Sequence, residues 1–345
     1  MAGAVMRQGD PPPVVCFGEM LLRLSPMPGI PLTRAAALDL AVGGAEANVA
    51  IALAGLGQAA SMLTVLPHNA LGRRALAALR EAGVATEHVT HAAGRLGTYY
   101  FEPPSGPVGG CVTYDRVGST FARAKAGDVG FVAALDGAAL LHLSGIIPAL
   151  GPDSAQLASA AIEAARNAGL PICFDGNYRA NLWNAWNSDP RAILTELVAS
   201  ATILIGNHRD ISLLLGKTFS GDGPDRRREA AEAAFDAFPD LQVIASTARH
   251  IESATVHRLA GRVDLRESHW QTEEVRIAPV VDRIGTGDAY AAGVIYRWLH
   301  DGSAQDMAKS GLALAAMKHG VIGDSICIGH AELEAFDLGG ADVSR

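Results

Sequence analysis

The chain has 345 residues, 49% of them hydrophobic, which is enough to bury the core of one large α/β domain with an accessory element. Its 28 basic and 36 acidic residues give a net charge of −8, which argues against a general nucleic-acid-binding surface. The sequence shows no apolar run of about 18 residues and no secretory signal, so we expect no membrane span and a cytoplasmic location.

The chain begins with residues 1–13, which end in three prolines and are expected to be a flexible leader. Residues 14–17 are predicted to form the first strand of a parallel sheet, because a short apolar run ends there at Gly18. Gly43 and Gly44 then open a small-residue helix over 49–56. A strand over 61–66 and a helix over 69–82 follow.

Residues 97–123 interrupt this alternation. Strand-like segments at 98–102 and 111–116 are joined by a turn rich in proline and glycine. We therefore predict a β-hairpin inserted into the domain, placed to act as a lid over a ligand.

Beyond residue 139 the alternation of strands and helices resumes. Strands are predicted at 139–143, 171–175, 202–205, 242–246, 254–259 and 274–278. Helices are predicted at 154–168, 191–199, 211–215, 225–238, 287–300 and 304–319. This order predicts an α/β fold with a mainly parallel central sheet and helices on both faces.

The cysteines and histidines give no sign of a metal site formed by protein side chains. Cys16, Cys111, Cys173 and Cys327 lie far apart and form no Cys-x-x-Cys pair, so we expect buried, reduced thiols. The histidines show no metal-ligand spacing, and His142 is expected to be a core residue because it lies within an apolar strand.

The most informative segment is Gly285-Thr286-Gly287-Asp288, which precedes the helix predicted at 287–300. Two glycines let the backbone close around an anionic group, and the N–H groups of the next helical turn then point at it. Asp288 lies where a base would accept the proton of an attacking hydroxyl. The segment indicates phosphoryl transfer.

Other polar groups are predicted at the same edge of the sheet. Arg179 follows the strand at 171–175, where a guanidinium suits a carboxylate or phosphate, although a simple polar loop fits equally well. Tyr114 and Arg116 share one face of the hairpin, with Tyr99 expected across from them, and this surface suits a ligand with one negative charge. The alternative is that they are ordinary strand side chains without a role in binding.

Two further segments are weaker signals. Gly43-Gly44 followed by Asn48 suits contacts with sugar hydroxyls, but a tight turn explains the glycines as well. Asn207 and Asp210 follow the strand at 202–205 and suit either a phosphate and water-bound magnesium or a helix cap. The sequence contains neither a P-loop nor a Gly-x-Ser-x-Gly motif, which argues against a P-loop enzyme and against a serine hydrolase.

Together these motifs resemble the PfkB, or ribokinase-like, family of carbohydrate kinases over residues 14–336. Within it, segments 141–150, 175–183 and 318–324 are similar to the 2-keto-3-deoxygluconate kinase subgroup. The resemblance implies a three-layer α/β/α kinase domain over 14–338, with a β lid formed by about 18–40 and 97–123. It also implies a homo-oligomer, a dimer or a larger assembly. We expect neither a membrane nor a nucleic acid as a partner.

The resemblance further implies ATP, Mg²⁺ held mainly by phosphates and water, and transfer to the terminal 6-hydroxyl of a sugar acid. Asp288 would be the base, and Gly285, Thr286 and Gly287 the anion hole. The sugar acid would be contacted by Gly43, Gly44, Asn48, Tyr99, Tyr114, Arg116, Arg179 and Asp324. The nucleotide would be contacted by Asn207, Thr247 and Arg249 as well as by the glycine turn.

The sequence departs from the family pattern near the nucleotide. A glycine turn usually follows the strand at 242–246, but no glycine occurs there, and Arg249 is the alternative phosphate ligand. Asp210 stands where the family usually has a glutamate, and Thr286 replaces a small residue in the glycine turn. Two other functions therefore stay open: a kinase of a neutral sugar such as fructose or ribose, and a sugar-binding protein without activity.

Overall fold

The structure is a computed structural model that describes residues 11–105 and 108–337. Most of the predicted leader lies outside the described residues, and residues 11–13 form neither helix nor strand. Residue 338, the predicted end of the kinase domain, also lies outside them.

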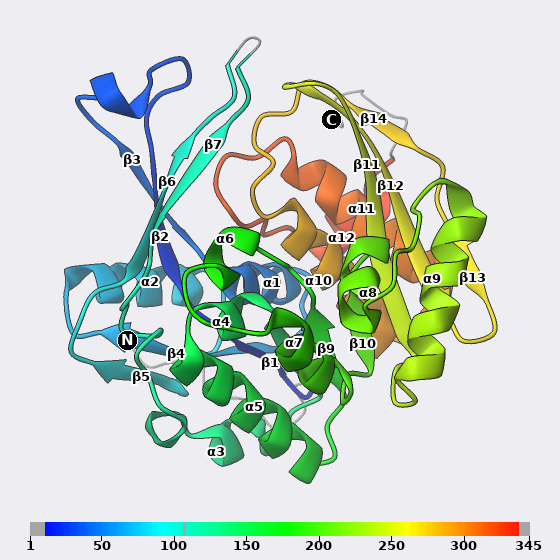
Figure 1. Ribbon diagram of the computed structural model, residues 1–345. Helices are drawn as coiled ribbons and strands as arrows, with labels where there is room; N and C mark the ends of the chain where they lie inside the picture. The colour runs from blue at the N-terminus through cyan, green and yellow to red at the C-terminus, as the bar shows by residue number, and fades with distance from the viewer. Residues whose placement is uncertain (1–10, 106–107, 338–345) are drawn as a thin grey trace.

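A sheet of ten strands forms the centre of the molecule, in the order β13-β12-β11-β10-β9-β8-β1-β4-β5, with β14 beside β12 (Figure 1). Pairing is parallel from β5 to β11 and antiparallel around β12. The bounds are β1 (Val14–Phe17), β4 (Ala60–Pro67), β5 (Val89–Ala92), β8 (Leu140–Ser144), β9 (Ile172–Asp175), β10 (Ile203–Ile205), β11 (Val243–Ser253), β12 (Val256–Leu265), β13 (His269–Gln271) and β14 (Val275–Ile277).

Helices cover both faces of this sheet, which confirms the predicted fold class. Val14 and Cys16 of β1 pack into one core, and Val15 and Phe17 into the other, because successive strand residues point to opposite faces. The first core includes α1 (Ala45–Gly55), α2 (Ala70–Glu81), α10 (Thr286–Leu299), α11 (Ala304–Lys318) and α12 (His330–Ala335). The second includes α3 (Phe131–Leu135), α4 (Ile146–Ala149), α5 (Pro152–Asn167), α6 (Ala180–Trp183), α7 (Pro190–Val198), α8 (His208–Leu215) and α9 (Gly223–Ala237).

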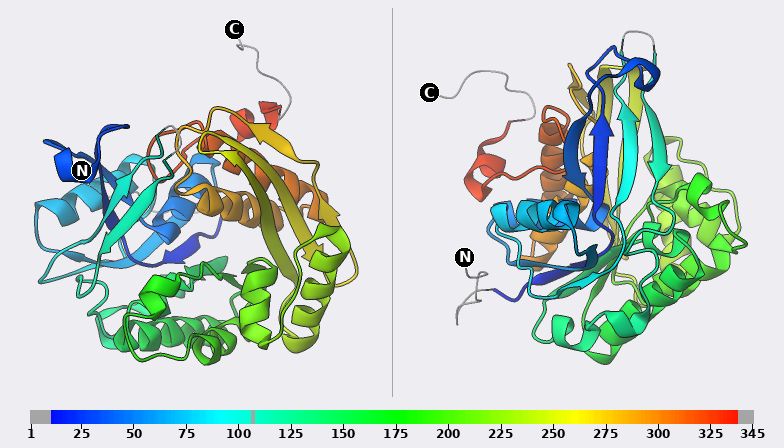
Figure 2. Two further views of the ribbon diagram at one scale, coloured as in Figure 1. Left: turned by 45° about the horizontal axis from the view of Figure 1, so that its top comes forward. Right: turned by 90° about the vertical axis from the view of Figure 1, so that its left-hand side faces the viewer.

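A separate four-stranded sheet forms the lid, in the order β3-β2-β6-β7. Its strands are β2 (Leu21–Ser25), β3 (Asp39–Gly43), β6 (Gly97–Glu102) and β7 (Cys111–Asp115). Tyr99 is paired with Tyr114 across β6 and β7, as predicted. The lid sheet and the long β11–β12 hairpin rise on opposite sides of the molecule (Figures 1 and 2).

Two expectations are wrong in detail. The strand predicted to end at residue 246 continues as β11 to Ser253, because its polar end pairs with β12. Cys111 and Cys327 are exposed rather than buried, although all four cysteines are free thiols. His142 is buried as predicted, with 1% exposure. In the described part of the chain, none of the helices combines the length and apolar character needed to cross a bilayer.

Candidate active site

A cleft of about 930 Å³ opens between the lid and the β11–β12 side, at the carboxyl ends of the parallel strands. Ligands bind at this edge of open α/β sheets, because loops from several strands converge there. Of the residues predicted to form the site, only Gly43 does not line the cleft. The others are Gly44, Asn48, Tyr99, Tyr114, Arg116, Arg179, Asn207, Thr247, Arg249, Gly285, Thr286, Gly287, Asp288 and Asp324.

The turn that leads into α10 has a conformation and surroundings that require glycine. Gly285 has a φ of 78°, and a Cβ atom there would lie 1.6 Å from the carbonyl oxygen of Asp324. Asp282 supports the same turn, since its Oδ1 accepts a hydrogen bond from the Ile284 N–H at 3.0 Å. The first N–H groups of α10 have no acceptor within the helix, and Gly285, Thr286 and Gly287 line the cleft, so the turn is suited to an anion.

Asp288 lies in the first turn of α10 and is 9% exposed. Asn48 of α1 donates a hydrogen bond from Nδ2 to Asp288 Oδ2 at 2.6 Å. Burial raises the pKa of Asp288 to about 6; the Asn48 hydrogen bond opposes this shift, the Asp324 charge adds to it, and Arg179 and Lys318 oppose it. A carboxylate with such a pKa is suited to accept a proton near neutral pH.

The rate of turnover should therefore depend on pH through Asp288. Only the ionised carboxylate accepts a proton, so we expect kcat/KM to fall as the pH drops through about 6 and to level off above it. Initial rates between pH 4.5 and 9, with stability checked at each pH, measure this limb. A flat profile across pH 5–7 would contradict the assignment of Asp288 as the base.

The lid contributes contacts to the opposite wall. The Tyr99 hydroxyl donates to Asp324 Oδ2 at 2.5 Å, and both groups line the cleft. Gly43 makes room for that carboxylate, because a Cβ atom at this position would lie 2.0 Å from Asp324 Oδ2. Gly44 has a φ of 143° and precedes α1, so it fixes the direction in which α1 presents Asn48.

Arg116 differs from the expectation that it is a free substrate ligand. It is 3% exposed, and its Nε and Nη2 donate to Glu19 Oε2 at 2.9 and 2.6 Å. The Ser119 hydroxyl also donates a hydrogen bond to Glu19 Oε1. The positive charge of Arg116 is thus neutralised by a protein carboxylate, although the side chain borders the cleft beside Tyr114.

Arg179 is exposed at the start of α6 and lines the cleft. Its Nη1 donates a hydrogen bond to the carbonyl oxygen of the neighbouring Tyr178 at 3.1 Å, and it forms no ion pair with a described residue. Its charge nevertheless opposes the rise in pKa that burial causes at Asp175, Asp210 and Asp288. Arg179 therefore offers a guanidinium to the cleft without a fixed partner.

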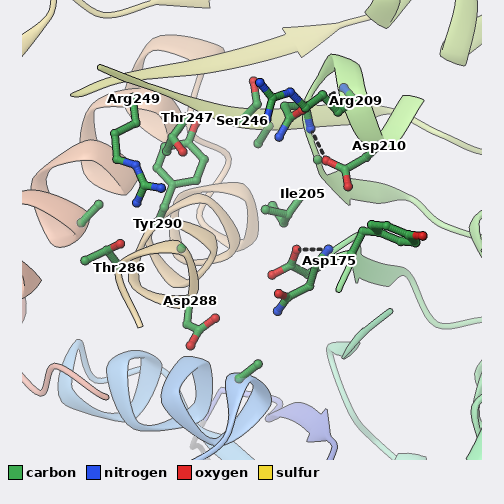
Figure 3. Close-up of a pocket in the computed structure, with 18 of the residues that line it drawn as sticks. Asp175, Ile205, Arg209, Asp210, Ser246, Thr247, Arg249, Thr286, Asp288 and Tyr290 are labelled. Atoms are coloured by element: carbon green, nitrogen blue, oxygen red, sulfur yellow. Dashed lines mark hydrogen bonds between the residues drawn. The ribbon is translucent and has the colours of Figure 1, made fainter. Parts of the chain in front are cut away.

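The β11 side of the cleft carries a second group of cations. Arg249 extends from β11 toward Thr286 in Figure 3, and Thr247 lies on the same strand. Burial lowers the pKa of Arg249, and the nearby charges of Arg283 and Arg179 lower it further. Within the described chain, neither Arg249 nor Arg283 forms a salt bridge. Like charges gathered in this way favour the binding of a polyanion.

Asn207 and Asp210 are partly used to cap α8. The Asn207 side chain accepts from the Arg209 N–H at 2.8 Å, and Asp210 accepts from the Asn207 N–H at 2.8 Å. Asp175 faces the same cavity as Asp288 from the other side (Figure 3), and its pKa is raised by burial and by Asp288 and Asp210. No cluster of three or more potential metal-ligating side chains occurs in residues 11–105 and 108–337.

Several charged residues near the turn were not predicted from the sequence. Arg23, Asp282 and Lys318 are buried, with respectively 4%, 4% and 0% exposure, and Arg283 lines the cleft. One signal was available for Arg23, since an arginine inside the apolar run at 21–25 needs a buried partner. The partner itself was not predictable, because it lies more than 250 positions away.

A three-layer α/β fold, a glycine turn followed by Asp288 at the start of a helix, and arginines without a salt bridge to any described residue occur together around one cleft, and this combination is typical of a phosphotransferase. Similarity to known proteins agrees with this class. The profile described as pfkB family carbohydrate kinase matches residues 12–330, so the chain belongs to that family.

Individual relatives extend over nearly the whole chain. It is 32% identical over 333 residues to 2-dehydro-3-deoxygalactonokinase of Haloferax volcanii, covering 96% of this chain and 99% of that protein. It is 28% identical over 317 residues to 2-dehydro-3-deoxygluconokinase of Thermoproteus tenax, covering 90% of each. The solved 2-dehydro-3-deoxygluconokinase of Thermotoga maritima has 33% identity and a TM-score of 0.88, over 93% of this chain and 98% of that one. The predicted family and its fold are confirmed.

Proposed function

We propose that this protein is an ATP-dependent kinase of 2-keto-3-deoxy sugar acids that phosphorylates their terminal 6-hydroxyl. The substrate is 2-keto-3-deoxygluconate, also called 2-dehydro-3-deoxygluconate, or its galactonate-derived counterpart. One observation carries the proposal: a single cleft contains the candidate base Asp288 and the guanidinium of Arg179, which forms no ion pair with a described residue. A guanidinium so placed suits a carboxylate at the far end of a substrate. The names of the relatives from Haloferax volcanii and Thermoproteus tenax support the same substrate class.

Asp288 would accept the proton of the substrate hydroxyl. Asn48 occupies its Oδ2, while Oδ1 receives no hydrogen bond from a residue that the structure describes. As the hydroxyl oxygen bonds to the γ-phosphorus of ATP, the bond between that phosphorus and the bridging oxygen would break and ADP would leave, while the hydroxyl proton would pass to Oδ1. Asn48 holds the carboxylate in one orientation during this transfer.

The Gly285–Gly287 turn would hold the negative charge that develops on the transferred group. Its N–H groups are fixed before the substrate arrives, so no reorganisation is needed during the reaction. ATP supplies the phosphoryl group, and Mg²⁺ neutralises charge on its phosphates. The donor set fits an ion held mainly by phosphates and water, with Asp175 and Asp210 as the nearby carboxylates.

Arg249 and Arg283 would bind the phosphates of the nucleotide. The family's usual glycine turn is absent from this place, and β11 continues instead, carrying Arg249 into the cleft. A charged hydrogen bond contributes about 1.5–3 kcal/mol, so one guanidinium is sufficient to change nucleotide affinity about tenfold or more.

We therefore expect Arg249→Leu to raise KM for ATP about tenfold or more while KM for the sugar acid stays within about twofold. Initial rates with each substrate varied separately measure both constants. Arg276→Leu is the matched control, because Arg276 lies exposed on β14 and does not line the cleft. Equal KM values for ATP in the Arg249 variant and the control would exclude Arg249 from the nucleotide site.

An ADP-release assay over a panel of substrates tests the proposed function. The panel contains 2-keto-3-deoxygluconate, 2-keto-3-deoxygalactonate, fructose and ribose. We expect kcat/KM for a sugar acid to exceed that for either neutral sugar by about 10–10²-fold, the difference that one charged hydrogen bond supplies. Faster turnover of fructose or ribose would favour the neutral-sugar alternative. Calorimetry that shows sugar-acid binding without ATP binding would favour a non-catalytic protein.

A further inference from the structure

The lid contains a buried arginine that the proposed chemistry does not use. Arg23 stands in the middle of β2, between leucines, and is 4% exposed. Its Nη1 lies 2.6 Å from Asp282 Oδ2 and 3.1 Å from Asp324 Oδ1. Its Nε donates to Ser25 Oγ at 2.9 Å, and the guanidinium carbon lies 4.4 Å from the centroid of the Phe101 ring. One nitrogen atom of the lid thus joins two carboxylates of the kinase core.

Both carboxylates support the turn that precedes α10. Asp282 lies just before the turn and accepts from the Ile284 N–H at 3.0 Å and from the Gly323 N–H at 3.1 Å. Asp324 touches the turn from the other side, since its carbonyl oxygen occupies the space that a Cβ atom on Gly285 would need. A shift of either aspartate therefore moves the turn.

Among the described residues, Arg23 is the cation that forms a salt bridge with each of these two buried carboxylates. The side chains of Asp282 and Asp324 are only 2% and 3% exposed. Lys318 is a second buried cation, with 0% exposure, but its Nζ donates to the Val321 carbonyl at 2.8 Å rather than to a carboxylate. Removal of one partner from a buried ion pair leaves the other charge uncompensated, and the structure around it must rearrange.

Lid strands β2 and β6 act on the same carboxylate, since the Tyr99 hydroxyl of β6 also donates to Asp324. Movement of the lid away from the core would break the contacts of Arg23 and Tyr99 together. The position of the lid and the shape of the anion-binding turn are therefore linked through a few polar contacts.

We infer that Arg23 is a positioning residue for phosphoryl transfer: its bridge to Asp282 and Asp324 sets the Gly285–Gly287 turn, so that the turn takes its catalytic shape only with the lid docked. Arg23 itself does not line the cleft, so it acts through the two aspartates. The inference depends on the proposed function only for the identity of the reaction.

Arg23→Met removes the charge at similar length, and Arg23→Lys keeps a charged nitrogen that can still bridge both carboxylates in part. A small displacement of the reacting groups costs about 10²-fold in rate, so we expect Arg23→Met to lower kcat by about that factor with KM values within about threefold. Arg23→Lys should restore part of kcat. Arg34→Met is the matched control, because Arg34 is an exposed arginine of the same lid segment and should behave like the unmodified protein.

Amide hydrogen exchange gives a second readout that needs no activity. We expect Arg23→Met to speed exchange in segments 283–288 and 321–325 while exchange in α5 and α7 is unchanged, and the same pattern more weakly in Arg23→Lys. An Arg23→Met protein that is folded, with unchanged kcat and unchanged exchange at the turn, would overturn the inference. If Arg23→Met does not fold, then normal kcat and normal exchange at the turn in Arg23→Lys would overturn the inference instead. Absence of any kinase activity in the unmodified protein counts against the proposed function alone, since the exchange experiment still decides the role of Arg23.

Discussion

Asp288→Asn is expected to lower kcat by about 10²–10⁴-fold, the usual contribution of a positioned general base, with little change in either KM. The amide keeps the size and the hydrogen-bonding environment of the carboxylate but cannot accept the hydroxyl proton. Asn48 should remain in place, since it contacts the oxygen that is not proposed to receive the proton. Steady-state rates at pH 8, where the carboxylate of the unmodified protein is ionised, measure the loss.

The stability of the same variant separates a catalytic effect from misfolding. Burial raises the pKa of Asp288 to about 6, so the ionised group is disfavoured in the folded chain, and this cost develops as the pH rises from about 4 to about 6. Asparagine removes the charge, and the thermal midpoint at pH 7 should be at least that of the unmodified protein. Asp236→Asn, at an exposed position on α9, is the control. A near-normal kcat in Asp288→Asn would show that Asp288 is not the base.

Arg179→Leu should discriminate between acidic and neutral substrates. Loss of one charged hydrogen bond, about 1.5–3 kcal/mol, corresponds to a rise in KM for the sugar acid of about 10–10²-fold. KM for fructose, if it is turned over at all, should hardly change. Arg179 suits this test because it is exposed and unpaired, so its loss leaves no buried charge behind.

Arg116→Leu is a poorer test of substrate recognition, since it would leave Glu19 buried without its partner and destabilise the fold. Arg73→Leu is the better control for Arg179→Leu, because Arg73 is exposed on α2 and does not line the cleft. A KM for the sugar acid equal to that of the control would mean that another group binds the carboxylate.

Local patterns in the sequence were sufficient to predict the layers of the fold. Apolar runs with glycine or asparagine at their ends place β1, β4, α2 and most later elements within a few residues of their observed bounds. Lid strands β2 and β3 were not predicted as separate strands. The segment assigned to the lid, about 18–40, includes β2 but ends at the start of β3. β2 pairs with β3 and also with β6, about 75 positions away, and a partner at that distance leaves no local signal.

The same distinction holds for the site. Asp288, Gly285 and Gly287 form one local motif, and the roles proposed for them could be predicted from the sequence of that motif alone. The Glu19 partner of Arg116 and the Arg23 bridge to Asp282 could not be predicted, because each joins residues that only the fold brings together. The sequence indicates which charges are present but not which of them neutralise one another.

The bridge between Arg23 and Asp324 joins positions 301 residues apart, and the Asn48–Asp288 hydrogen bond spans 240. At ordinary rates of translation the first lid strand leaves the ribosome on the order of 15–60 s before its partners are made. Throughout that interval the nascent chain holds Arg23 and Asn48 without their counterparts. A polypeptide released before residue 282 would lack both the proposed base Asp288 and the Gly285–Gly287 turn, so we expect it to have no kinase activity at all.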